Sequence, residues 1–281
     1  MNKLTKAGFA GLFLSLTAVL ASCGGSSTST TDTAAVTADV YPVTVGDLTL
    51  DAQPVSIISL SPTATEMLYA IGAGSQVVAV DEYSNFPAEA VALGTTLSGF
   101  EPNIEAISSY SPDLVIVSYD PGSLVEQLGT LNIPVFVAGA AMSLENVYEQ
   151  IEQLGVLTGH SQAAIEVSKT LQTGIEDAVA SVKFSEPPLS YYYELDNTYY
   201  SVTSNTFVGQ IFNLFGMRNI ADNVESGNDY PQLSAEVIVS SDPDFIFLAD
   251  TKCCAQDATT VAARDGWGGL KAVTAKPSSR T

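Results

Sequence analysis

Short apolar runs alternate with helical patterns between residues 55 and 138. Short runs rich in β-branched and other apolar residues predict strands at 55–60, 77–80, 114–118 and 134–138. Apolar residues at helical spacing predict helices at 62–71, 103–110 and 123–131. An antiparallel hairpin is predicted at 41–50, with its turn at Gly46-Asp47. Strands that alternate with helices predict a mostly parallel sheet covered on both faces, whose functional edge lies at the carboxyl ends of the strands.

The pattern changes between residues 143 and 182, where apolar residues recur at helical spacing only. This predicts a pair of helices, of which the second is long and amphipathic. A second α/β series follows, with strands at 189–195, 199–203 and 245–248 and helices at 206–215 and 234–240. The predicted fold class is therefore α/β, with two Rossmann-like lobes joined by a single long helix. The lobes are placed at residues 40–142 and 184–281, and the helical linker at 143–183.

The first 22 residues have the layout of a secretory signal peptide, in which Lys3 and Lys6 precede an apolar run at 7–21. That run is shorter than the ~20 residues that span a bilayer. It ends in Leu20-Ala21-Ser22-Cys23, which resembles a bacterial lipobox, where the cysteine is lipidated and becomes the new N-terminus. An ordinary signal peptide with an incidental cysteine is the alternative. The polar segment 23–39 then predicts a flexible tether. We expect an extracytoplasmic protein, lipid-anchored through Cys23 to a bacterial cell membrane.

The charge of the chain excludes one class of partner. The formal net charge is −21, and removing Lys3 and Lys6 leaves eight basic residues against 31 acidic ones, a net charge near −23. A surface of this sign is unsuited to nucleic acid, because phosphate binding depends on clustered Lys and Arg. We therefore expect no nucleic-acid partner.

The sequence lacks the common catalytic and metal-binding motifs. It has no Gly-x-Ser-x-Gly, no His-Glu-x-x-His, no phosphate loop and no Cys-x-x-Cys, and His160 is its one histidine. We therefore expect a protein that is not an enzyme, with no cofactor and no metal site. Cys253 and Cys254 are adjacent. They can form a vicinal disulfide, remain thiols or pair between molecules, and their spacing does not decide between these states.

The junction at residues 55–69 is the most informative short segment. An apolar strand ends at Ser59-Leu60-Ser61, and a helix begins at Pro62, a residue that suits the first helical turn. Ser61 can cap this helix, and Glu66 favours its positive end. The junction therefore presents polar atoms at a sheet edge that typically faces a ligand, and Ser61 is a candidate ligand-binding residue.

The order of short motifs along residues 40–273 resembles the substrate-binding proteins of ABC importers for cobalamin and ferric siderophores. The motifs include Ser59-Leu60-Ser61-Pro62, Tyr83-Ser84-Asn85-Phe86-Pro87, Pro102-Asn103-Ile104-Glu105, Ser111-Pro112-Asp113, Pro231-Gln232-Leu233-Ser234-Ala235-Glu236 and Asp242-Pro243-Asp244. The resemblance implies two lobes whose relative motion is limited by the connecting helix, and a shallow ligand cleft between them. It also implies delivery of the ligand to a membrane permease. We expect the protein to be a monomer.

The resemblance also implies which aromatic residues face the ligand. Tyr83 and Tyr230 match aromatic positions of the cobalamin binder, and Phe100 matches a third if the loop alignment shifts by one residue. Tyr119 or Ser118 occupies a fourth position. Rigid aromatic side chains suit a flat or apolar ligand.

Three further residues are candidate ligand-binding residues on the basis of the sequence pattern alone. We expect one of Tyr199 and Tyr200 to reach the ligand, because neighbouring residues of a strand face opposite sides. Lys252 is the one basic residue at a strand's carboxyl end.

The family docks onto its permease through one acidic residue in each lobe, and Glu105 and Glu236 match these two positions. Both fall in the first turn of a predicted helix, where a carboxylate is also favoured by the helix dipole. A capping role alone is therefore the alternative to docking, and one residue can serve both.

The scarcity of basic residues narrows the classes of ligand that the chain is expected to bind. After the signal peptide the chain has three arginines, Arg218, Arg264 and Arg280, and none lies in a predicted cleft loop. Anionic catecholate siderophores and haem normally require clustered Arg or Lys. A corrinoid, a hydroxamate ferric siderophore or another bulky polar nutrient remains, and the tyrosines favour a corrinoid. A cell-surface sensing or adhesion lipoprotein on the same fold is the alternative function.

The C-terminal end departs from the family pattern. The family continues with a further strand and a long helix, whereas residues 274–281 have no apolar period. We expect from this an incomplete second lobe with exposed apolar surface and reduced stability.

Overall fold

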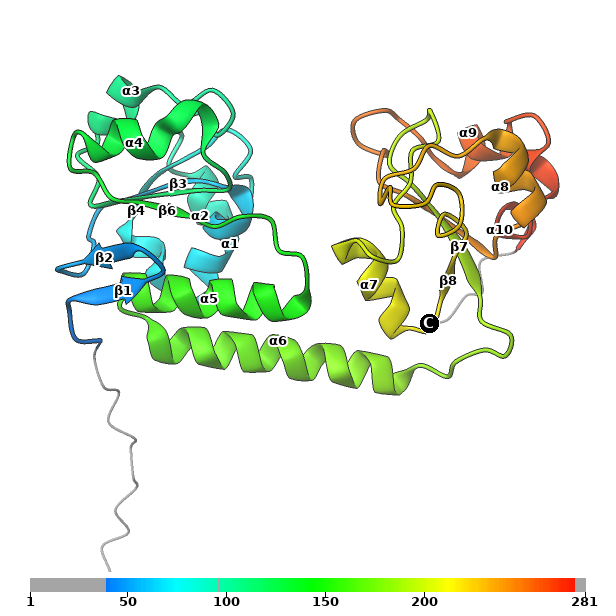
Figure 1. Cartoon of the computed structure of the whole chain (residues 1–281), viewed down its shortest axis with the longest axis horizontal. Helices are drawn as coiled ribbons and strands as arrows, with labels where there is room; N and C mark the ends of the chain where they lie inside the picture. The colour runs from blue at the N-terminus through cyan, green and yellow to red at the C-terminus, as the bar shows by residue number, and fades with distance from the viewer. Residues whose placement is uncertain (1–38, 96, 276–281) are drawn as a thin grey trace, which may run out of the picture. The chain divides into compact units, whose positions relative to one another are not determined.

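The computed structural model describes residues 39–95 and 97–275 (Figure 1). The predicted signal peptide, Cys23, nearly all of the predicted tether, and Arg280 lie outside these residues. The strands are β1 (Val43–Val45), β2 (Leu48–Leu50), β3 (Ile57–Leu60), β4 (Val77–Val80), β5 (Leu114–Val117), β6 (Val135–Val137), β7 (Ser190–Glu194), β8 (Arg218–Asn219) and β9 (Phe245–Leu248). The longer helices are α1 (Pro62–Ala70), α5 (Leu144–Thr158), α6 (Ser161–Ser181), α7 (Phe207–Leu214) and α8 (Ala235–Ser241). The shorter ones are α2 (Ala88–Val91), α3 (Ile104–Ser108), α4 (Leu124–Gly129), α9 (Ala258–Ala262) and α10 (Lys271–Thr274), with 3₁₀ turns η1 (Ala73–Gln76), η2 (Pro121–Ser123) and η3 (Trp267–Gly269).

The first sheet has the strand order β4-β3-β5-β6, and all of its pairings are parallel. Alternate apolar residues of β3 and β5 enter two different cores. Ile57 packs with α1, α5 and α6 on one face, whereas Ile58 packs with α3 and α4 on the other (Figure 1). The predicted strands, the helices on both faces and the antiparallel hairpin β1–β2 are confirmed. Because all four strands run parallel, their carboxyl ends form one edge.

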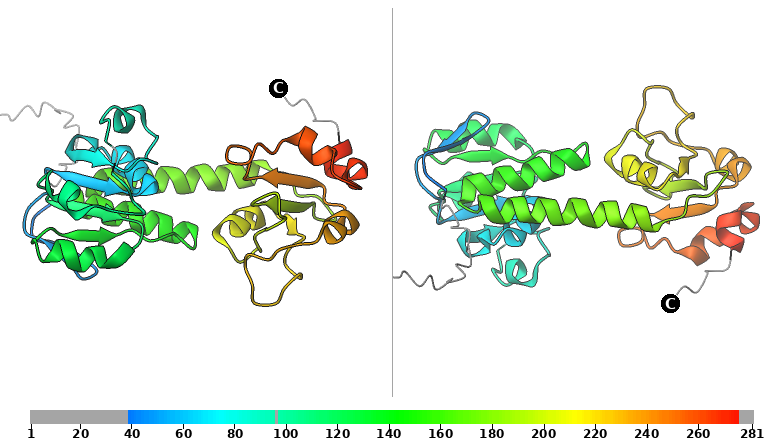
Figure 2. Two further views of the ribbon diagram at one scale, coloured as in Figure 1. Left: turned by 90° about the horizontal axis from the view of Figure 1, so that it is seen from above. Right: turned by 90° about the horizontal axis from the view of Figure 1, so that it is seen from below.

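The helix pair predicted at 143–182 is α5 followed by α6, seen along its length in Figure 2. Ser143 caps α5 through a hydrogen bond that its side chain accepts from the backbone of Asn146. Gly159 ends α5 in the left-handed conformation at φ 77°, which glycine adopts without steric cost. The two helices approach closely at Gly155, where an added Cβ would lie 2.4 Å from the Cβ of Ala164. His160 lies between the two helices, at the N-cap position of α6.

The second sheet has the strand order β8-β7-β9, again all parallel. The tyrosines of β7 alternate between its faces, as the period of a strand requires. Tyr192 packs with Trp267 in the core formed with α8, α9 and η3, whereas Tyr191 and Tyr193 contact Phe212 of α7. Tyr191 and Tyr192 are fully buried, so core packing accounts for both.

The two sheets share one local structural feature, a Pro-Asp pair that precedes a strand. Asp113 accepts hydrogen bonds from the backbone of Val55 and Ser56 at 2.9 and 3.0 Å. Asp244 accepts from the backbone and hydroxyl of Ser190 at 2.8 and 2.9 Å. Each carboxylate ties the start of one strand to the start of its parallel neighbour.

The predicted strand at 199–203 is wrong. Tyr199 has φ 72°, which is left-handed rather than extended, and only Tyr200 makes a ladder contact, an isolated bridge to Gln232. The backbone of Ser201 donates to Pro231 at 3.0 Å, so this segment pairs with a loop instead of joining the sheet. The strand β8 and the helices α2, α9 and α10 were missed, because two to five residues are too short to establish a period.

Candidate functional site

The carboxyl-end edge of the first sheet carries a pocket of about 290 Å³. It is lined by residues at or just after the carboxyl ends of β3, β4 and β5 and by the loop at 97–100, namely Leu60, Pro62, Asp81, Tyr83, Gly99, Phe100, Ser118 and Tyr119. The parallel topology brings these segments together although they are up to 59 positions apart in the chain.

Three predicted ligand residues meet at this pocket. The rings of Tyr83 and Phe100 lie edge to face, with centroids 5.5 Å apart and planes at 81°. The ring of Tyr119 lies 6.4 Å from Phe100. Their exposed fractions are 54%, 62% and 42%, respectively, so a substantial apolar area of each faces outward. The clustering is what aromatic contact with a flat or apolar molecule requires.

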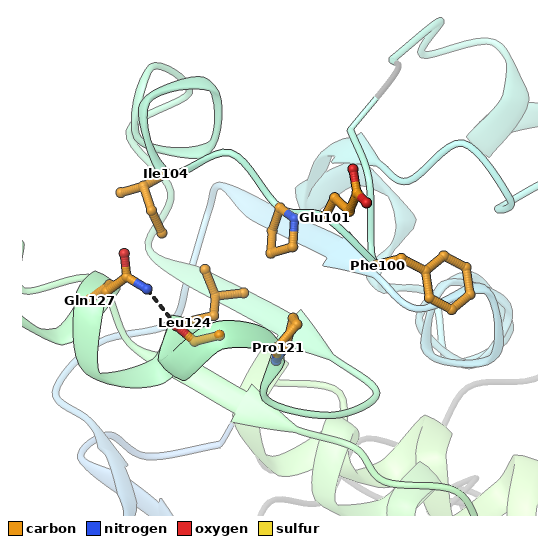
Figure 3. A pocket seen from close by; sticks show the side chains of 8 residues that line it. Phe100, Glu101, Ile104, Pro121, Leu124 and Gln127 are labelled. Carbon is orange, nitrogen blue, oxygen red and sulfur yellow. Dashed lines mark hydrogen bonds between the residues drawn. The ribbon is translucent and has the colours of Figure 1, made fainter.

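A second pocket, of about 230 Å³, adjoins the first through Phe100, which lines both. Figure 3 shows its labelled side chains Glu101, Ile104, Pro121, Leu124 and Gln127 around the opening. Gln127 donates from Nε2 to the carbonyl of Gly122 at 2.6 Å, which fixes the turn at η2.

Ser61 is placed differently from the aromatic residues. It is buried, and its hydroxyl caps α1 by accepting from the backbone of Ala64 at 3.3 Å. Behind it runs a chain of buried polar side chains that the sequence reasoning missed. Ser59 donates to the carbonyl of Ser61 at 3.1 Å, and Thr65 Oγ1 donates to Ser59 Oγ at 2.8 Å. Thr65 also contacts Ser84 Oγ at 2.9 Å.

The chain of hydroxyls ends at Asp81, whose Oδ1 accepts from Ser84 Oγ at 2.5 Å. Burial raises the pKa of the Asp81 carboxyl above its ordinary value, against the lowering effect of the Ser84 hydroxyl and nearby backbone N–H groups. A polar residue that directly follows a buried strand was the available sequence signal, because β4 ends at Val80.

The remaining predicted ligand residues follow the strands of the second sheet in the chain, with Tyr199 and Tyr200 after β7, Tyr230 after β8 and Lys252 after β9. Tyr230 and Tyr200 are exposed, and Lys252 is exposed in the loop after β9. Tyr199 instead stacks on Trp267, with ring centroids 5.6 Å apart and planes at 27°.

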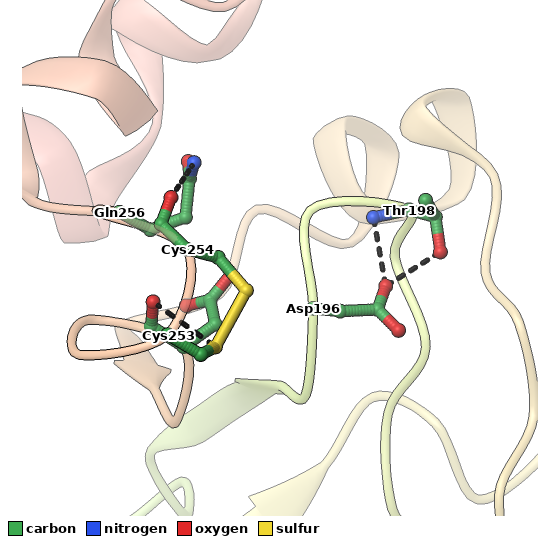
Figure 4. The surroundings of a disulfide bond; sticks show 6 residues. Asp196, Thr198, Cys253, Cys254 and Gln256 are labelled. Atoms are coloured by element: carbon green, nitrogen blue, oxygen red, sulfur yellow. Dashed lines mark hydrogen bonds between the residues drawn. A yellow bond between two sulfur atoms is a disulfide. The ribbon is translucent and has the colours of Figure 1, made fainter.

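Cys253 and Cys254 form a vicinal disulfide in the loop after β9 (Figure 4). The backbone N–H of Cys254 donates to Asp250 at 3.0 Å, and Gln256 donates to the carbonyl of Cys254 at 3.2 Å. The turn at Asp196 and Thr198 lies beside the pair in Figure 4. Of the three states that the sequence left open, the structure has the intramolecular disulfide.

A buried ion pair joins Glu194, the last residue of β7, to Arg264. Arg264 donates from Nη1 and Nη2 to the two carboxylate oxygens of Glu194, both at 2.6 Å, and from Nη2 to Gln256 at 2.8 Å. Its guanidinium also lies over the ring of Trp267, 4.6 Å from the centroid. Burial raises the pKa of Glu194, the hydrogen bonds from Arg264 lower it, and nearby Asp250 raises it. The guanidinium of Arg264 is therefore occupied by contacts inside the protein, which agrees with the position of Arg264 outside the predicted cleft loops.

The two predicted docking residues lie on exposed first turns. Glu105 is in the first turn of α3, capped by Asn103, and Glu236 is in the first turn of α8, capped by Ser234. The backbone N–H of Glu236 and the hydroxyl of Ser234 lower the pKa of Glu236, so it is ionised near neutral pH.

Two features are absent from the described residues. Among residues 39–95 and 97–275, no helix is both long and apolar enough to span a membrane. Within the same ranges, no group of three or more His, Cys, Asp and Glu side chains is arranged to hold a metal ion.

Comparison with known proteins gives a consistent result. The family model described as "Periplasmic binding protein" matches residues 57–276. A cobalamin-binding protein of Halobacterium salinarum is 34% identical over 218 residues, which cover 73% of this chain but only 58% of that relative. An uncharacterized ABC transporter substrate-binding lipoprotein of Bacillus subtilis, YvrC, is 29% identical over 95% of this chain and 87% of its own length. Among solved structures, the periplasmic vitamin B12-binding protein BtuF of Vibrio cholerae aligns with a TM-score of 0.57 and 27% identity, covering 70% of this chain and 77% of that chain.

Proposed function

This chain belongs to the periplasmic binding protein family, and from that membership we propose that it is the extracytoplasmic substrate-binding protein of an ABC importer for a corrinoid. The observation that carries the choice of ligand is the pocket at Tyr83, Phe100 and Tyr119. Three of its eight lining residues are aromatic and none is basic, and all eight lie in the described part of the chain. A corrinoid has broad apolar faces and uncharged amide side chains, so it suits such a pocket better than haem or a catecholate siderophore.

The names of two relatives support this proposal. The relative from Halobacterium salinarum is named for cobalamin binding, and the Bacillus subtilis relative is named a lipoprotein. By analogy with the latter, Cys23 carries the lipid that anchors the chain after removal of residues 1–22, and residues 23–39 form the tether. Glu105 and Glu236 dock onto the permease, and Tyr200, Tyr230 and Lys252 contribute the ligand surface of the second sheet. The protein acts as a monomer and performs no chemistry on its ligand.

The binding proposal is tested by a thermal melt of the full chain in detergent. Cobalamin, dicyanocobinamide, a ferric hydroxamate siderophore, a ferric catecholate siderophore and haem are compared at equal concentration. A ligand at 100 times its Kd stabilises the folded state by about 2.7 kcal/mol, so a true ligand gives a clear rise in Tm. We expect the corrinoids to give the largest rise. A larger rise with haem or a siderophore, or no rise with either corrinoid, contradicts the assignment.

The aromatic pocket is tested by Tyr83→Ala, with Tyr110→Ala as the matched control. Tyr110 is exposed at the end of α3 and does not line the pocket. Truncating an aromatic side chain that contacts a ligand costs about 1–2 kcal/mol, or roughly tenfold in Kd. Titration calorimetry with dicyanocobinamide should show this loss for Tyr83→Ala and less than a twofold change for Tyr110→Ala. If the two variants bind dicyanocobinamide with equal affinity, Tyr83 does not contact the ligand.

A further inference from the structure

Asp81 is the one acidic side chain that lines the aromatic pocket, among the eight lining residues of the described chain. It directly follows β4, and its backbone N–H donates to Ser59 at 3.0 Å, so the parallel pairing with β3 holds it in place. Its exposed fraction is only 3%. A carboxyl group with so little access to water is costly unless its oxygens have partners.

The two oxygens of Asp81 have different surroundings. Oδ1 accepts from Ser84 Oγ and is thereby fixed to the buried hydroxyls of Thr65 and Ser59. Oδ2 accepts from no side chain among residues 39–95 and 97–275. It faces Gly99, where an added Cβ would lie 3.4 Å away, and Gly99 itself lines the pocket. The same Cβ would lie 2.8 Å from the carbonyl oxygen of Leu60, so only glycine fits at position 99. Because Leu60, Asp81 and Gly99 all line the pocket, we place Oδ2 in the pocket wall, within reach of a ligand donor.

Oδ2 can accept a hydrogen bond in two protonation states of Asp81. An ionised carboxylate has an accepting Oδ2, and a carboxyl group protonated on Oδ1 has an accepting carbonyl at Oδ2. A site that presents a buried acceptor discriminates strongly for ligands with a donor at that position, because an unpaired acceptor is costly. A ligand carboxylate there would have neither a hydrogen to donate nor a favourable charge.

We propose that Asp81 is a specificity-determining residue of this pocket, which accepts a hydrogen bond from a primary amide or other N–H donor of the ligand and rejects a carboxylate in its place. This inference rests on the proposed corrinoid-binding function and adds the group that the pocket selects. The three aromatic rings contact the apolar body of the ligand, and Asp81 distinguishes ligands by their peripheral groups.

The test uses two corrinoid probes that differ in their peripheral groups, dicyanocobinamide with amides and cobyrinic acid with carboxylates. Their Kd values are measured by titration calorimetry for the full chain, for Asp81→Asn and for Asp81→Leu. Glu82→Gln is the matched control, because it removes the same single charge from the adjacent residue, which is exposed and does not line the pocket. Melting of each variant without ligand confirms that it is folded.

We expect the unmodified chain to bind the amide probe at least tenfold more tightly than the carboxylate probe. Asp81→Asn removes the charge and presents either its carbonyl or its NH2 group to the pocket. A primary amide can pair with either group, so binding of the amide probe changes less than threefold. The carboxylate probe escapes the charge repulsion and gains a donor, so its binding tightens at least tenfold. Asp81→Leu has no acceptor and loses at least tenfold for the amide probe. If Asp81→Leu does not fold, the two Kd values of Asp81→Asn decide the question.

Two results overturn the inference, and they can be told apart. If the unmodified chain binds the amide probe but Asp81→Asn has the same ratio of Kd values as Glu82→Gln, Asp81 does not select the ligand and the proposed function stands. If the unmodified chain binds neither corrinoid, the proposed function fails and the inference fails with it.

Discussion

Replacing Arg264 by leucine is expected to destabilise the protein severely. Glu194 has no exposed area and Arg264 has an exposed side-chain fraction of 13%, so their two 2.6 Å hydrogen bonds join charges that are largely removed from water. Leucine would fill part of the volume but would leave the Glu194 carboxylate buried without its cation. Removing one partner of a buried ion pair costs about 3–5 kcal/mol, a large part of the roughly 5–15 kcal/mol that stabilises a typical domain.

The loss of stability caused by Arg264→Leu should be larger at high pH than at low pH. In Arg264→Leu the pKa of Glu194 in the folded state rises further, because burial still disfavours the charge and the guanidinium no longer supports it. A carboxyl whose pKa is raised by folding favours the folded state at low pH and disfavours it as pH increases. The difference between the variant and the unmodified chain should therefore be largest near pH 7.5 and shrink toward pH 5.5, by up to about 1.4 kcal/mol per pH unit.

Equilibrium unfolding in urea at pH 7.5 and 5.5 measures both effects, followed by the fluorescence of Trp267, the only tryptophan in the chain. Arg218→Leu is the control, because Arg218 is exposed on β8 and should cost less than 1 kcal/mol. A double variant with leucine at positions 194 and 264 should recover most of the loss, since apolar pairs often replace buried ion pairs at little cost. A loss below 1 kcal/mol for Arg264→Leu, or a loss that does not change with pH, would refute the reasoning.

Two further predictions concern docking and strand pairing. Glu105→Ala and Glu236→Ala should leave the Kd for cobinamide within twofold but reduce uptake of labelled corrinoid by whole cells; a loss of binding would contradict the docking role. Asp244→Asn should cost about 1 kcal/mol near pH 7, because the carboxylate accepts two hydrogen bonds from the first residue of β7. Backbone and side-chain hydrogen bonds from that residue lower the pKa of Asp244, so this stabilisation is present above its ordinary value near 4 and is lost as pH falls through the lower folded-state value. Urea unfolding at pH 7 and pH 3 checks it, and an equal loss at both pH values would exclude the charged interaction.

Much of the first sheet and the helix pair could be predicted from the chain alone, because their signals lie between near neighbours. The mostly apolar run before Ser61 specifies a strand buried on both faces, and Pro62 and Ser61 specify where α1 begins. The spacing of apolar residues in α5 and α6 is equally local. The clustering of Tyr83, Phe100 and Tyr119 also follows from a simple rule, since parallel strands bring their carboxyl ends to one edge.

Other features depended on contacts between residues far apart in the sequence. The segment after β7 has the composition of a strand, yet the left-handed Tyr199 and the loop at 229–232 take it out of the sheet. Glu194 and Arg264 are separated by 70 positions, and nothing near either residue reveals the pairing. The buried position of Asp81 arises in the same way, because it ends a chain of hydrogen bonds through Ser84, Thr65 and Ser59, which belong to three different segments.

The amino-acid order by itself therefore determined the strands and helices with a clear period, the caps that bound them and the family to which the chain belongs. Local hydrophobic spacing and backbone preferences suffice for these. Only the tertiary structure decided which polar groups became buried partners and which aromatic rings remained exposed. Burial and hydrogen bonding depend on how distant segments pack in three dimensions, and that packing cannot be inferred from local sequence patterns.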